Sequence, residues 1–158
     1  MDSWLIFLIV FTALGSGLIA GVFFAFSSFV MHALGRLPAN EGIRAMQSIN
    51  LVVINPSFFG VFFGTALASL ALLVIAVVQW SERGAAHLLW GSLAYLIGSI
   101  GVTMVCSVPL NQAIAALDAQ SADAARVWQR YQTYWTRWNH VRAFAAMIAS
   151  ALFIHPLW

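Results

Sequence analysis

The side chains best suited to chemistry gather in one pentapeptide, Trp138-Asn139-His140-Val141-Arg142, at the start of an apolar stretch. Its amide, imidazole and guanidinium can donate hydrogen bonds, move a proton or stabilise an anion. A charged side chain at hydrocarbon depth is costly, and it usually faces a protein interior or a polar cavity. Arg142 is therefore the first candidate for a functional residue.

Helical geometry decides which of these groups can act together. A rotation of about 100° per residue places five side chains on one stripe of a continuous helix: Trp128, Tyr131, Trp135, Trp138 and Arg142. Asn139 lies about 60° from Arg142, whereas His140 lies about 160° away. We therefore expect Arg142 and Asn139 to share a cavity, with His140 turned elsewhere. In the alternative interpretation the aromatic residues form an interfacial belt, and Arg142 extends to the lipid headgroups.

The composition indicates a membrane protein. Hydrophobic residues make up 62% of the 158 residues and charged residues 8%, whereas soluble domains average about 45–50% and about 25%. The length fits a single membrane domain over residues 1–158, and a net charge of only +2 gives no indication of nucleic-acid binding. The one cysteine, Cys106, excludes an internal disulfide.

Four apolar stretches are long enough to cross a bilayer, for which about 20 residues suffice: residues 4–30, 56–80, 88–106 and 138–158. Pro56 suits the first turn of the second helix, and Pro109 is expected to end the third. The first and third connections are predicted to carry short helices, the later one capped by Ser121. The predicted fold is all-α, an integral membrane four-helix bundle.

The arginines predict how this bundle is oriented. Five of them lie in the first and third connections, and only Arg83 lies in the second: Arg36, Arg44, Arg126, Arg130 and Arg137 belong to the richer side. By the positive-inside rule the two long connections are cytoplasmic and both termini lie outside. We expect a bacterial inner membrane, with membrane lipid as a partner. Glycine pairs such as Gly17-x-x-x-Gly21 predict close helix packing, and they leave a homo-oligomer open.

Alternating helix directions bring further polar groups to the cytoplasmic end. These groups are Ser27, Ser28, Asn50, Asn55, Asn111, Asn139 and Arg142. A neutral-to-cationic pocket of this kind suits an aromatic phenol or enolate, whose negative charge an arginine stabilises. Taken singly, each asparagine is equally explained as a helix cap or a loop residue.

Histidine placement allows a different interpretation, in which His32 and His140 hold haem or copper at the same end. No His-x-x-x-His, Glu-x-x-His or Cys-x-x-Cys spacing supports it, and no carboxylate lies inside a predicted span. Proton-coupled transport normally uses such a carboxylate. There is also no phosphate-binding loop or dinucleotide fingerprint.

Three motifs resemble the anthrone oxygenase-like membrane proteins: residues 50–58 (NLVVINPSF), Val108-Pro109-Leu110-Asn111, and Trp135-x-x-Trp138-Asn139-His140-Val141-Arg142. The resemblance extends over nearly the whole chain and implies a four-helix integral membrane protein. Fungal relatives oxidise polycyclic anthrones to anthraquinones with dioxygen and no conventional organic cofactor. The resemblance implies Asn111, Trp138, Asn139 and Arg142 as site residues. Fungal members often have histidine at the position of Asn139.

We therefore expect a membrane-embedded oxygenase-like protein that acts on a small aromatic, anthrone- or quinol-like substrate, with dioxygen as co-substrate and no cofactor. Arg142, Asn139 and Asn111 are the candidate catalytic residues. Five further residues are candidates for substrate binding: Trp138, Trp135, Asn55, Asn50 and Ser28. Two alternatives stay open. One is a non-catalytic module or small permease that binds lipid, quinone or a small molecule, and the other is the haem or copper protein.

Overall fold

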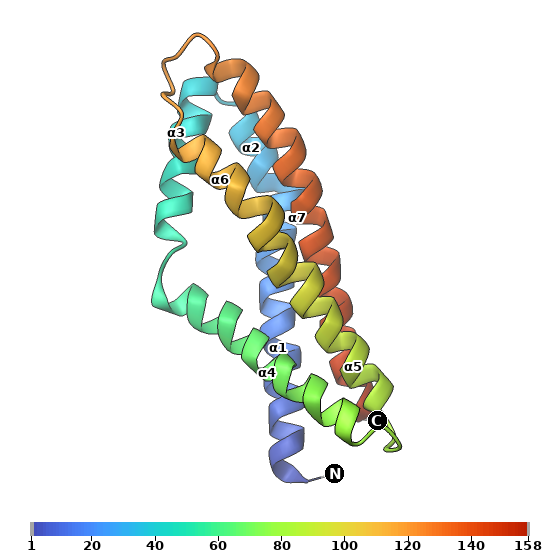
Figure 1. Cartoon of the computed structure of the whole chain (residues 1–158). Coiled ribbons are helices and arrows are strands. Elements are labelled where there is room, and N and C mark those ends of the chain that lie inside the picture. The colour runs from blue at the N-terminus through green and yellow to red at the C-terminus, as the bar shows by residue number, and fades with distance from the viewer. Residues whose placement is uncertain (1, 158) are drawn as a thin grey trace.

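The computed structural model describes residues 2–157, without the side chain of Leu157, and these residues form helices and no strand (Figure 1). Five helical stretches follow one another: α1 (Ser3–Ala25) with η1 (Phe26–Val30) and α2 (Met31–Gly35); α3 (Ala39–Val52); α4 (Pro56–Val78); α5 (Ala85–Leu93) with η2 (Ala94–Gly101), η3 (Thr103–Ser107) and α6 (Val108–Ala115); and α7 (Ala124–Ile154) with the short 3-10 helix η4 (His155–Leu157). The all-α prediction is confirmed.

Three of these stretches are long and apolar enough to cross a membrane: Ser3–Gly35, Pro56–Val78 and Ala85–Ala115. They indicate an integral membrane protein and agree with three of the four predicted spans. Helix α7 covers most of the fourth, but the polar segment around Asn139 and Arg142 lowers its hydropathy, and it is not among the three. The span over residues 138–158 therefore stays a prediction, and Trp158 lies outside the described residues.

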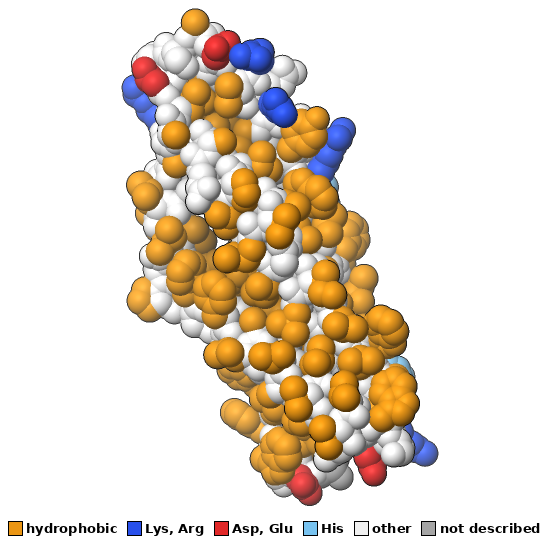
Figure 2. Space-filling model, viewed as in Figure 1, with side chains coloured by type: hydrophobic (Ala, Val, Ile, Leu, Met, Phe, Trp, Pro, Cys, Tyr) orange, Lys and Arg blue, Asp and Glu red, His pale blue; other side chains and the backbone are white. Residues whose placement is uncertain are grey.

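Helix α7 holds the fold together. It packs along α1 and against α5 and η2, while α4 packs against α1 and α5 (Figure 1). Ala146, Ala149 and Phe153 of α7 are fully buried in the main hydrophobic core. A second core joins α3, α6 and the first half of α7 around Ile43 and Trp128. On the face seen in Figure 2, hydrophobic side chains cover the middle and charged ones gather at the two ends, as expected for a bundle immersed in lipid.

Two predicted helix ends are wrong. The third helix does not end at Pro109, because a π-helical segment, η3, precedes the proline and α6 starts a new α-helical register at Val108. Pro109 then lies in the first turn, where its missing N–H costs no hydrogen bond. Ser121 does not cap the last helix: it lies in a turn whose backbone N–H donates to Asp118 O, and α7 begins at Ala124.

Three π-helical segments interrupt the long helices, and all three contact α7. A π-helix widens the turn and shifts every following side chain around the axis, and such segments occur frequently at functional sites. Here η1 lies in the first long helix, and η2 and η3 lie in the third. They therefore decide which side chains of both helices face α7.

Gly98 allows the third helix to pack closely against α7. A Cβ atom at this position would collide with the Cβ atom of Ala145 on α7, whereas a Cβ atom at Gly60 of α4 would meet nothing within 4 Å. We expect Gly98→Val to destabilise the protein by about 1–3 kcal/mol, the usual cost of overpacking, and Gly60→Val to leave its stability near the wild-type value. Thermal unfolding in detergent micelles measures both. An equal midpoint for the two variants would contradict this packing.

Candidate functional site

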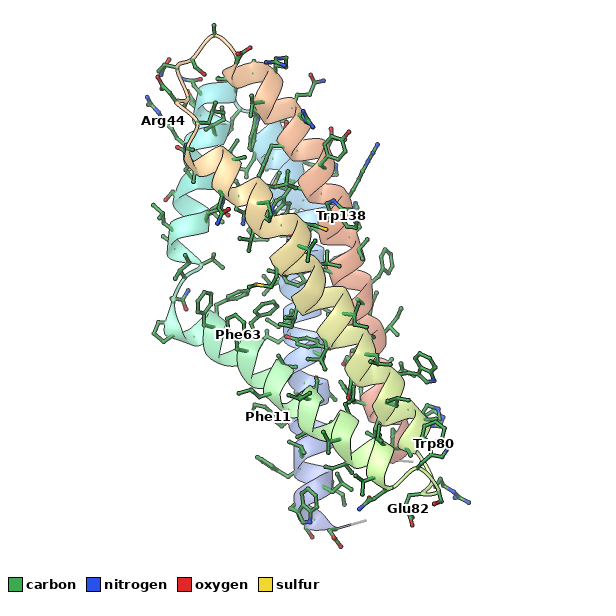
Figure 3. All side chains as sticks on the ribbon, in the orientation of Figure 1. Phe11, Arg44, Phe63, Trp80, Glu82 and Trp138 are labelled. Atoms are coloured by element: carbon green, nitrogen blue, oxygen red, sulfur yellow. The ribbon has the colours of Figure 1, made fainter. Side chains whose placement is uncertain are left out.

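The main candidate side chains lie on one buried stripe of α7. Five side chains of this stripe are at most 5% exposed, and they follow one another at steps of three or four residues: Trp128, Tyr131, Trp135, Asn139 and Arg142. Because α7 is continuous, one face of the helix carries them all. Trp138 was expected on this face, but it is 39% exposed and lies on the outside of α7 (Figure 3). The prediction that it lines the interior beside Arg142 is therefore wrong.

The Arg142 guanidinium is enclosed by groups from three helical stretches. Its Nη2 donates to Asn139 Oδ1 at 2.7 Å, and its Nη1 donates to Thr103 Oγ1 at 3.3 Å. The carbon Cζ lies 4.3 Å from the centre of the Phe23 ring and 5.1 Å from that of the Trp135 ring. Cations are attracted to such aromatic faces. The buried Nε has no hydrogen-bond partner among the described residues, so its N–H is left for another acceptor.

Asn139 anchors Arg142 to the first helix. Its Nδ2 donates to the backbone oxygen of Phe23 and to Ser27 Oγ, both at 2.7 Å, while its Oδ1 accepts from Arg142. Both amide protons are used, and the side chain is fully buried. The π segment η1, which contains Ser27, begins three residues after Phe23. The prediction that Asn139 and Arg142 converge is confirmed, and so is that of a different direction for His140, which is exposed.

Asn111 is held by the aromatic side chains of α7. Its Oδ1 accepts from the Tyr131 hydroxyl at 2.9 Å and from Trp135 Nε1 at 2.8 Å. Its oxygen is therefore engaged twice, whereas its Nδ2 makes no hydrogen bond to another described residue. Burial raises the pKa of the Tyr131 phenol, which stays protonated as a donor at neutral pH. Asn50 contributes a buried Nδ2 that has no hydrogen-bond partner within residues 2–157.

Other predicted residues serve local structure. Asn55 caps α4, because its Oδ1 accepts from Phe58 N at 2.9 Å and its Nδ2 donates to Val52 O at 2.9 Å. The Ser28 hydroxyl donates to Phe24 O at 2.7 Å and is exposed. We call Arg142 and the side chains that enclose it (Phe23, Thr103, Trp135 and Asn139) the Arg142 cluster. Among the described residues, neither Asn55 nor Ser28 has a side-chain hydrogen bond to this cluster. His32 Nδ1 contacts Ser28 O at 2.9 Å, and residues 2–157 contain no group of three or more potential metal ligands.

Several members of the cluster were absent from the sequence-based site. Thr103, Phe23 and Ser99, whose hydroxyl donates to Arg142 O at 3.3 Å, come from the two long helices that pack on α7. In the sequence, the only indication of this part of the site was the pair Ser99 and Thr103, two hydroxyl residues four positions apart in an apolar span. Tyr131 lay on the predicted stripe, and its bond to Asn111 links that stripe to α6.

Removal of the Asn139 side chain tests this network. Asn139→Ala would leave Arg142 Nη2, Phe23 O and Ser27 Oγ without their partner inside the protein. Each unsatisfied buried group costs about 1–3 kcal/mol, so we expect a clear fall in the thermal unfolding midpoint. The exposed Gln129 on the same helix is the control, since surface substitutions usually change stability by less than about 0.5 kcal/mol. Equal midpoints for Asn139→Ala and Gln129→Ala would disprove the anchoring role.

The chain matches a known protein family. The family model described as anthrone oxygenase matches residues 58–152, more than half of the chain. The matched segment includes Asn111, Asn139 and Arg142 together with Thr103 and Trp135. No curated protein and no solved structure matches the chain. The chain belongs to the anthrone oxygenase family.

Proposed function

We propose that this protein is a membrane-embedded oxygenase that uses dioxygen to oxidise a small anthrone- or quinol-like substrate. The observation that carries the proposal is the Arg142 guanidinium, which is 95% buried yet has an Nε–H without a partner among the described residues. Family membership supplies the reaction class. The family match includes Arg142, so the most unusual side chain of the structure lies in the segment shared with the family.

The proposed chemistry uses the acidity of an anthrone. Loss of a proton from the methylene carbon gives an enolate, whose oxygen carries the negative charge. A preorganised cation in a water-excluded site stabilises such an oxyanion far better than water does. Dioxygen then adds to the methylene carbon, and proton uptake gives a hydroperoxide. Loss of water breaks the O–O bond and forms the second carbonyl group, so that anthrone and dioxygen become anthraquinone and water.

The surrounding residues then take supporting roles in this proposal. Arg142 stabilises the enolate oxygen, and Asn139 positions Arg142, because both amide protons of Asn139 are already bound. The free amide N–H groups of Asn111 and Asn50 orient the substrate oxygens. Trp135 lies against the guanidinium and Phe26, with its ring centre 5.6 Å from that of Phe26, and offers an aromatic wall to the substrate rings.

A non-catalytic binding module is the second candidate, and the tight enclosure of Arg142 favours it. The guanidinium contacts aromatic rings of Phe23 and Trp135 and hydrogen-bonds to Asn139 and Thr103. A charge held in this way can fix the helix packing without any chemistry. Turnover measurements separate the two candidates.

We also propose that α7 supplies the fourth span from about Trp138, which completes a four-helix bundle in a bacterial inner membrane. The arginine distribution supports cytoplasmic long connections and outside termini. Both termini lie at one end of the molecule, and α2, α3 and the start of α7 lie at the other (Figure 1).

Substitution of Arg142 tests the oxygenase. We expect Arg142→Ala to lower kcat for anthrone oxidation by about 10²–10³-fold, as loss of an oxyanion-stabilising donor usually does, and Arg142→Lys to retain part of the rate through its charge. Arg137→Ala, which removes an arginine that lies over the Tyr134 ring on the same helix, should keep the wild-type rate. Anthraquinone formation under air, followed by absorbance, measures all three. No turnover by the wild type would favour the binding module, whereas equal turnover by Arg142→Ala and wild type would overturn the proposed role of Arg142.

Labelling of single cysteines tests the orientation. In a Cys106→Ser background, we expect a membrane-impermeant maleimide to label Ser81→Cys in intact cells, because the turn between α4 and α5 lies outside. Gln120→Cys should react only in inverted vesicles. Both positions are exposed, so accessibility to the reagent depends on the side of the membrane. The reverse pattern would overturn the orientation.

A further inference from the structure

A groove that adjoins the Arg142 site at Ser27 runs between the first helix and α7. Its volume is about 720 Å³, within the range of about 300–1,000 Å³ that is usual for ligand sites. Gly21, Phe24 and Ser27 line one wall, and His140, Phe144 and Met147 line the other. The first wall belongs to the candidate span Ser3–Gly35, so the groove opens toward lipid in the proposed orientation.

The outer walls of this groove suit an aromatic ligand. Phe24, Phe144 and Met147 are each more than half exposed, at 63%, 59% and 51%, and they are free to contact an incoming molecule. Aromatic rings and a thioether pack favourably on a flat ring system. Gly21 has no side chain to occupy the groove, and an added Cβ atom there would meet nothing within 4 Å.

The inner wall connects the groove to Arg142. Ser27 lines the groove and is 5% exposed, and its hydroxyl oxygen accepts a hydrogen bond from Asn139, which in turn accepts one from Arg142. The Ser27 hydroxyl donates no hydrogen bond within the described residues, so its proton is available to a ligand oxygen. Two hydrogen bonds thus separate the groove from the guanidinium.

We propose that this groove takes up a flat, largely apolar aromatic molecule with an oxygen substituent from the bilayer, as the membrane-side binding site for the substrate of Arg142. The identity of that substrate rests on the proposed oxygenase function. The rings lie between Phe24, Phe144 and Met147, and the oxygen accepts from Ser27 with His140 nearby. A polar end beside an otherwise apolar wall fits a ligand of this kind better than the hydrocarbon tail of a lipid, which has no oxygen to place there.

Filling the groove tests the proposal directly. Gly21→Leu places a side chain in the groove, while Gly60→Leu places the same side chain in open space on α4. The two glycines are matched in sequence context, because each begins a Gly-Val-Phe-Phe tetrapeptide. A hydroxyanthraquinone serves as the probe, and its fluorescence is titrated with protein in nanodiscs of phosphatidylcholine and phosphatidylglycerol. We expect the Kd to rise at least tenfold in Gly21→Leu and to stay unchanged in Gly60→Leu.

A second pair of variants keeps the test valid if Gly21→Leu fails to fold. Met147→Ala removes a groove wall, and Ile148→Ala removes a neighbouring side chain of similar exposure, 52%, that does not line the groove. We expect only Met147→Ala to weaken binding severalfold. Equal Kd values within both pairs, or retention of the probe in Gly21→Leu together with loss of co-purified phospholipid, would overturn the proposal and assign the groove to lipid.

Turnover separates this inference from the proposed function. If Gly21→Leu loses the probe while no form of the protein oxidises anthrone, the groove is supported and the oxygenase is not. If anthrone is oxidised and Gly21→Leu raises KM with kcat unchanged, both are supported. An unchanged KM in a folded Gly21→Leu protein that oxidises anthrone would overturn the groove as the substrate's binding site and leave the oxygenase intact.

Discussion

The burial of the Arg142 charge is the constraint on which the rest of the structure depends. An isolated cation removed from water is very unfavourable unless hydrogen bonds and nearby electron-rich groups compensate. Here Asn139, Thr103 and two aromatic faces provide that compensation. Because Phe23 belongs to the first long helix and Thr103 to the third, the same charge fixes how both helices pack on α7.

The π-helical segments make this arrangement feasible. All three lie where the long helices contact α7, and each shifts the side chains that follow it around the helix axis. Ser27 and Thr103, which complete the hydrogen bonds of Asn139 and Arg142, both belong to π segments. Irregular turns are tolerated in a membrane helix where neighbouring side chains satisfy the backbone, and Asn139 does this for the oxygen of Phe23 just before η1.

In the proposed oxygenase, the Arg142 site meets the polar requirements of a membrane-dissolved aromatic substrate and the groove meets the apolar ones. The Arg142 cluster offers charge and amide donors in a closed interior, whereas the groove offers exposed rings and a thioether on the outside. Ser27 belongs to both. Asn139 donates both amide protons, to Phe23 O and to Ser27 Oγ, and so links the site to the groove. Because an amide has no capacity to act as a base, the contribution of Asn139 and Arg142 in the proposed oxygenase is electrostatic stabilisation by Arg142.

Local periodicity determined much of this protein from its sequence alone. Composition and apolar length predicted the all-α membrane class and three of the spans, and the rotation of about 100° per residue predicted that Asn139 joins Arg142 while His140 turns away. Trp138 was misplaced because it lies at the edge of that stripe, where rotation alone does not decide burial. Only tertiary structure decided the partners, since Phe23 lies 116 residues from Asn139 and Thr103 lies 39 residues from Arg142. The π segments change the helical register without a periodic signal, which is why the continuation through Pro109 and the enclosure of Arg142 required the folded chain.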